Sequence, residues 1–204
     1  MTTYSETFID EHRRINVDYD WWGSTYDDFR SVCAILGIDL NKHEPSFSGF
    51  WCQGDGASFT GTYHAAKHYV PASYYDTAPA KIREHAPEDT VLHEIADALH
   101  VLACQYWPVY APIERGYGSH YVHSNTMTIG NIEPVDDGAI DELPDAIYVA
   151  VEEVLKTQMR ALADWLYGIL DKEYEYLTSD EAVVETLEAN DMQEEEVEDE
   201  EVYA

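Results

Sequence analysis

The strongest constraint on the fold of this 204-residue chain is a long stretch of helical periodicity toward its C-terminal end. From about residue 144 to residue 176, apolar residues recur every three or four positions, the spacing that places them on one face of an α-helix. The residues of this stripe are Ile147, Val151, Val154, Leu155, Leu162, Trp165, Leu166 and Ile169. We expect this helix to be the main support of the fold.

Two other regions show the alternation that is typical of strands. Residues 46–63 alternate aromatic and small side chains on either side of Gly54-Asp55-Gly56, which predicts two strands joined at a glycine-rich turn. Residues 116–132 alternate again and predict one long strand or a hairpin. The predicted fold class is α+β, with a small, mainly antiparallel sheet from residues 45–63 and 117–133 that helices cover.

Shorter helices are expected around this sheet. Ser24 is a plausible N-cap for a helix that Gly37 ends, and Ser179 opens a short helix to about Leu187. The remaining predicted helices cover residues 5–14, 77–85 and 87–105.

The charge of the chain is far from balanced. It carries 41 Asp and Glu against 11 Lys and Arg, a formal net charge of −30 at pH 7, while 45% of its residues are hydrophobic. Residues 191–204 contain eight acidic and no basic residues, so residues 1–190 still carry −22. We predict a single α+β domain over residues 1–190, followed by an acidic, low-complexity, solvated tail.

Such a charge restricts the partners of the protein. It disfavours direct binding to nucleic acid or to an anionic membrane, because both are polyanions, and it attracts basic proteins. Three explanations predict this composition: adaptation to high salt, mimicry of nucleic acid, and an ordinary acidic protein with a solvated tail. The charge of residues 1–190 argues against the last explanation.

The cysteines and the N-terminal residues indicate in which cellular compartment the protein is expected. Cys33, Cys52 and Cys104 are scattered and lack CxxC spacing, which favours free thiols in a reducing compartment. Residues 1–10 have no basic region followed by an apolar run, and no stretch of about 18 apolar residues occurs. We therefore expect a cytoplasmic protein.

Histidines are the first candidates for chemistry. Pairs at close spacing are His64 and His68, His93 and His100, and His120 and His123. A zinc site could be assembled from them, yet no ligand signature is spelled out, so hydrogen-bonded histidines without metal or cofactor are the expectation.

Gly54-Asp55-Gly56 lacks the spacing and the lysine of a phosphate-binding loop, and a tight turn explains it. The remaining functional interpretation is a loop that presents Gln53 and Asp55 to a partner.

No motif of a catalytic site is evident in the sequence. No GxSxG motif occurs, no cysteine has a suggestive histidine nearby in sequence, and carboxylates are too abundant to single out a catalytic pair. We predict no catalytic residues and no enzyme activity.

Several segments together resemble an uncharacterised family carried by phages and prophages. The central one is FSGFWCQGDGASF, residues 47–59. The others are Trp21, Trp22, Tyr26 and Asp28, the stretch 82–87, the stretch 120–127 and the helix 163–181. The chain departs from the family pattern at Cys52, where the family has Ser, and in its longer tail. Some members are labelled antitoxins, and the resemblance implies a phage accessory protein in a host cytoplasm.

These inferences lead to a hypothesis of an acidic inhibitor that mimics DNA. It would block a basic host protein that binds DNA or RNA, such as a defence, replication or transcription protein. The expected partner-binding residues are Gln53, Asp55, Glu152, Glu153, Asp171, Glu173, Asp180 and Glu181. An antitoxin that neutralises one basic toxin is the alternative, and a small metal-dependent hydrolase is a further one. The many aromatic residues are also compatible with a homodimer.

Overall fold

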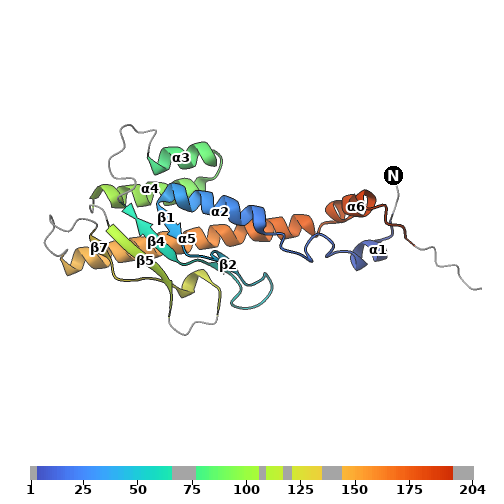
Figure 1. Ribbon diagram of the computed structural model, residues 1–204, viewed down its shortest axis with the longest axis horizontal. Coiled ribbons are helices and arrows are strands. Elements are labelled where there is room, and N and C mark those ends of the chain that lie inside the picture. Colours follow the sequence, from blue (N-terminus) through green and yellow to red (C-terminus); the bar gives the residue numbers. More distant parts are fainter. Residues whose placement is uncertain (1–3, 66–76, 106–108, 117–120, 135–143, 195–204) are drawn as a thin grey trace, which may run out of the picture. The chain divides into compact units, whose positions relative to one another are not determined.

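The chain packs as two compact units in the computed structural model, which describes residues 4–65, 77–105, 109–116, 121–134 and 144–194 (Figure 1). Unit 1 combines residues 1–23 with residues 170–204, and unit 2 comprises residues 24–169. Helices and antiparallel strands are both present, so the predicted α+β class is confirmed.

Unit 2 contains the main sheet. Its strands are β1 (Ile38–Leu40), β4 (Gly61–His64), β5 (Val109–Arg115), β6 (Met127–Ile129) and β7 (Glu133–Pro134). The order is β1-β4-β5-β6, every pairing is antiparallel, and β7 pairs with the other end of β5. The predicted strand region 117–133 was too long. In its described part, residues 121–133, residues 124–126 form a 3-10 turn and only β6 and the start of β7 are strands. Residues 117–120 lie outside the described part of the chain.

No element was predicted over residues 109–115, where strand β5 lies, and this strand contains a proline. Proline cannot donate a ladder hydrogen bond, so Pro112 argues against a central strand. On this side of β5, β6 pairs with residues 113–115 and β7 with residues 109–110, which leaves Pro112 at the gap between them. The carbonyl of Pro112 accepts a hydrogen bond from the Gly130 amide at 2.8 Å. The sheet thus accommodates the proline by interrupting its ladder there.

A second, two-stranded sheet is formed by residues that lie between β1 and β4 in sequence. β2 (Ser46–Phe47) pairs with β3 (Ala57–Ser58) on either side of the glycine-rich turn, as predicted. Residues 61–64 do not extend this hairpin, because they form β4 and pair with β1 and β5 instead.

Helices α2 (Gly23–Leu36), α3 (Ala78–His85), α4 (Thr90–Gln105) and the first part of α5 (Asp145–Leu177) complete unit 2. Phe29 of α2 is fully buried, and its ring lies 5.3 Å from that of Phe59 and 6.3 Å from that of Trp165 on α5. Gly37, with a φ of 78°, ends α2 as expected, whereas the helix begins at Gly23, so Ser24 is not its N-cap. Figure 1 shows α2, α4 and α5 beside the strands.

Unit 1 is helical. It contains α1 (Glu6–Glu11), the end of α5 and α6 (Asp180–Ala189), which Ser179 caps as predicted. Tyr4, Val183 and Leu187 form its buried cluster, with partly buried apolar residues around them. Met192 also packs there, and its carbonyl accepts a hydrogen bond from the Tyr4 hydroxyl at 2.9 Å.

The first residues of the predicted tail are therefore packed within unit 1. The Ser5 amide donates to Glu194 at 2.9 Å, and hydrogen bonds from Ser5 lower the pKa of the Glu194 carboxyl. Residues 195–204 of that tail lie outside the described part. Among the helices that the structure describes, none is both long and apolar enough to cross a membrane.

Candidate functional site

The glycine loop, residues 48–56, is closed by polar contacts between its own residues. The Ser48 amide donates to the Gly56 carbonyl, and the Gly56 amide donates to the Ser48 hydroxyl, both at 3.1 Å. The Asp55 carboxylate turns inward and accepts from the amides of Trp51 at 2.9 Å and Cys52 at 2.6 Å. These contacts hold one loop conformation, because each backbone group has a defined partner.

A second segment, residues 121–123, lies directly against this loop. A Cβ atom at Gly54 would lie 3.2 Å from the Tyr121 ring, and one at Gly56 would lie 2.9 Å from the His123 ring. The Ser48 hydroxyl also donates to the carbonyl of Val122 at 3.2 Å. The two glycines are thus required for this close approach, and Gly54 also has a φ of 97°.

The loop and this segment expose large aromatic side chains. Trp51 is 76% exposed and Tyr121 is 65% exposed. Gln53 is exposed as well, whereas Asp55 is only partly exposed because its carboxylate caps the turn. Sequence reasoning missed Trp51 and Tyr121, because Trp51 lay in a predicted strand before the turn at Gly54-Asp55-Gly56 and Tyr121 lay in another predicted strand region.

A partly buried ion pair anchors the hairpin to the main sheet. Glu44 is buried, and its carboxylate accepts from the Arg115 guanidinium at 2.7 Å and from the Thr60 hydroxyl at 3.0 Å. Arg115 Nε also donates to the buried Ser58 hydroxyl at 2.8 Å. Burial and the negative charge of Glu44 raise the pKa of Tyr26 to about 12. This cluster joins β3 to the end of β5, so it positions the glycine loop.

The acidic residues are distributed unevenly between the two units. Unit 1 has 58 residues with 20 acidic and 3 basic ones, a net charge of −17. Unit 2 has 146 residues and a net charge of only −13. More than half of the net charge therefore belongs to little more than a quarter of the chain.

The expected partner-binding acids fall on both units. Glu152 and Glu153 belong to the part of α5 in unit 2, where Glu152 is partly buried and Glu153 is exposed and paired with Lys156. The other four lie in unit 1: Asp171 and Glu173 are partly buried, and Asp180 and Glu181 are exposed. The eight predicted residues are thus divided between the two units.

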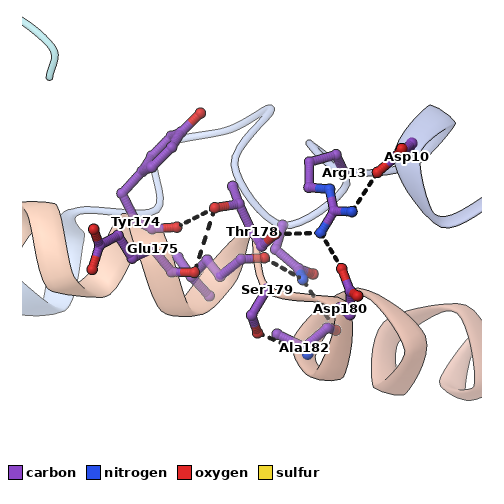
Figure 2. A network of polar contacts seen from close by, with 10 residues as sticks. Asp10, Arg13, Tyr174, Glu175, Thr178, Ser179, Asp180 and Ala182 are labelled. Atoms are coloured by element: carbon purple, nitrogen blue, oxygen red, sulfur yellow. Dashed lines mark hydrogen bonds and ion pairs between the residues drawn. The ribbon is translucent and has the colours of Figure 1, made fainter. Parts of the chain in front are cut away.

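Asp180 belongs to a polar network at the corner between α5 and α6 (Figure 2). The Arg13 guanidinium pairs with Asp10 and Asp180 and donates to the carbonyl of Thr178 at 3.1 Å. Hydrogen bonds to Asp10 and Asp180 raise the pKa of Arg13. Asp180 thus has a role within unit 1, where it ties the N-terminal segment to α6.

The exposed side of α6 carries a row of further carboxylates. Glu181, Glu185 and Glu188 are exposed and follow one another at helical spacings of four and three, so they share one face. The opposite face buries Ala182, Val183 and Leu187. Only Glu181 of this row was singled out from the sequence.

Three of the described candidate histidines have a polar partner at one ring nitrogen. His64 Nε2 lies 3.2 Å from a carboxylate oxygen of Asp39, His93 Nε2 lies 2.9 Å from the Ala86 carbonyl, and His123 Nδ1 accepts from the Asn125 amide at 3.0 Å. No group of three or more His, Cys, Asp or Glu among the described residues could hold a metal ion. His68 and His120 lie outside those residues.

The cysteines differ in environment. Cys33 is fully buried on α2, and burial raises the pKa of its thiol, whereas Cys52 and Cys104 are exposed. All three are free, as expected. The expectation that no cysteine has a histidine nearby in sequence was wrong for Cys104, because α4 brings His100 Nε2 within 3.7 Å of its sulfur. The i, i+4 spacing on a helix produces this contact.

Comparison with known proteins gives one match. No curated protein and no solved structure matches the chain. A protein family matches residues 21–180, a range that includes the glycine loop, residues 121–123 and the whole of α5. Since this range exceeds half of the chain, the protein belongs to the family described as Domain of unknown function (DUF8835).

Proposed function

We propose that this protein is an acidic inhibitor that binds a basic nucleic-acid-binding protein and occupies the surface which that partner uses for DNA or RNA. The observation that carries the proposal is the concentration of charge in unit 1, a net −17 in 58 residues. The resemblance of residues 47–59 to a phage-borne family suggests the setting, a phage-encoded protein in a host cytoplasm.

The row on α6 supports mimicry of a phosphate backbone. A helix rises about 1.5 Å per residue, so Glu181, Glu185 and Glu188 span about 10 Å of its axis. One strand of B-DNA presents about three phosphates over the same length. A groove lined by lysine and arginine could therefore meet these carboxylates at a spacing close to that of its natural ligand.

The test is capture of partners from a host lysate on the immobilised full chain, with and without competing duplex DNA. We expect nucleic-acid-binding proteins to be captured, and to be released by DNA and by salt. Partners that neither DNA nor salt releases would contradict mimicry and would favour the antitoxin alternative.

A charge-matched pair of variants tests the contribution of α6. Replacing Glu181, Glu185 and Glu188 by Gln should weaken capture roughly tenfold, at about 0.5 kcal/mol for each lost surface ion pair. The control replaces Glu84, Glu88 and Glu94 by Gln, three exposed acids of unit 2, and should leave capture unchanged. Equal losses in both variants would show that only net charge matters and would overturn the assignment to unit 1.

A further inference from the structure

Unit 2 exposes two large aromatic side chains at the glycine loop and the segment beside it. Trp51 and Tyr121 are the most exposed of the large hydrophobic residues that the structure describes, at 76% and 65%. They come from segments 70 residues apart in sequence, and the close approach of Tyr121 to Gly54 brings these segments together. Exposed aromatic side chains on a soluble surface commonly mark interaction sites.

The backbone beneath these side chains is held in place before any partner arrives. The Asp55 carboxylate accepts from the Trp51 and Cys52 amides, and Ser48 bonds both to Gly56 and to the Val122 carbonyl. A side chain on a backbone that is already ordered loses less entropy on binding. The loop therefore has the construction expected of a preformed binding surface.

The charge of the chain indicates which side chain would bind there. Residues 46–64 contain no Lys or Arg and residues 121–129 contain no charged residue, while the whole chain carries −30. Two arginines contact these segments and both have partners: Arg115 pairs with Glu44, and Arg160 donates to the carbonyls of Asn125 and Met127. A guanidinium group combines attraction to an acidic protein with stacking on an aromatic face.

We infer that the exposed rings of Trp51 and Tyr121 form a docking surface for arginine side chains of the basic partner. This inference rests on the proposed function and adds to it a second contact surface, on unit 2. The acidic residues supply long-range attraction, and the aromatic rings supply a contact that salt screens less.

The experiment is an NMR titration of the full chain, labelled with ¹⁵N, using a nona-arginine peptide as the probe. The indole signal of Trp51 is assigned by its loss in Trp51→Phe, and it should shift strongly as the peptide is added. The Trp165 indole, which donates to Asp89 at 2.6 Å, is the internal reference and should stay in place. A neutral glycine-serine nonapeptide should shift neither signal.

Matched variants measure the energetic contribution. Trp51→Ala and Tyr121→Ala should each weaken peptide binding about 2- to 5-fold without changing the net charge. Tyr19→Ala removes an equally exposed tyrosine, at 64%, from unit 1 and should leave the affinity unchanged. Circular dichroism of each variant checks that the fold is retained.

The outcomes separate this inference from the proposed function. A peptide that fails to bind the wild-type chain overturns both. Binding that is equal in wild type, Trp51→Ala and Tyr121→Ala overturns only the docking surface and leaves charge-driven binding standing. A Trp51 signal that responds to protein concentration alone, or to single-stranded DNA instead of the peptide, shows a self-association or nucleotide surface and overturns the inference.

Discussion

At the scale of single residues, Tyr26 couples stability to pH. Burial and the nearby Glu44 carboxylate raise its pKa to about 12, above its ordinary value of 10.0. The folded state therefore favours the protonated phenol, so this contribution to stability is complete below pH 10 and is lost as the pH rises toward 12. We expect the free energy of unfolding, measured by urea denaturation, to fall over this range, and Tyr26→Phe to reduce the slope.

Tyr63 and the exposed Tyr19 are the comparisons for the predicted pH dependence of stability. Tyr63 is fully buried and burial also raises its pKa, so part of the pH dependence should remain in Tyr26→Phe. Tyr19→Phe changes an exposed ring and should keep the wild-type slope. A Tyr26→Phe slope identical to that of wild type would show that the Tyr26 phenol ionises as it does in the unfolded chain.

At the scale of secondary-structure elements, Asn16 holds the corner between α5 and α6. Its Nδ2 donates to the carbonyls of Leu177 at 3.0 Å and Ala182 at 3.2 Å, and its Oδ1 accepts from the Thr186 hydroxyl at 2.7 Å. Asn16 is buried, so its removal leaves these partners unsatisfied. We expect Asn16→Ala to lower the free energy of unfolding by about 2–4 kcal/mol, as measured by urea denaturation at 222 nm.

An asparagine-to-alanine substitution at an exposed site is the control, because it removes the same side chain without affecting the corner between α5 and α6. Asn190 lies at the end of α6 and donates one exposed hydrogen bond to the Thr186 carbonyl. Asn190→Ala should cost less than about 1 kcal/mol. Equal losses at both sites would mean that the corner contributes nothing beyond an ordinary surface contact.

At the scale of the whole molecule, the uneven charge predicts an uneven response to salt. Like charges repel within unit 1, and the Debye length falls from about 30 Å at 0.01 M to about 3 Å at 1 M ionic strength. Raising the salt concentration should therefore slow amide hydrogen exchange more in α6 than in α4, measured by mass spectrometry in the same sample. Because α4 belongs to unit 2, it is the internal control, and equal slowing would contradict the prediction.

Only part of the candidate site could be predicted from the sequence. The turn at Gly54-Asp55-Gly56 was predicted correctly because glycine has a local conformational meaning. The inward direction of the Asp55 carboxylate and the position of Tyr121 were not predicted. Both depend on tertiary contacts, within the loop for Asp55 and between two separate segments for Tyr121. The Glu44–Arg115 pair joins residues 71 positions apart, and no local pattern indicates such a pair.

The sequence by itself determined the α+β class, the long helix α5, the cap of α6 at Ser179 and the end of α2 at Gly37. These features follow from periodicity and from local backbone preferences, which act within a few residues. Tertiary structure alone decided that β5 lies in the sheet despite Pro112, and that α1, the end of α5 and α6 form a separate, highly acidic unit. Strand pairing and the packing of distant segments depend on nonlocal contacts, so local patterns do not specify them.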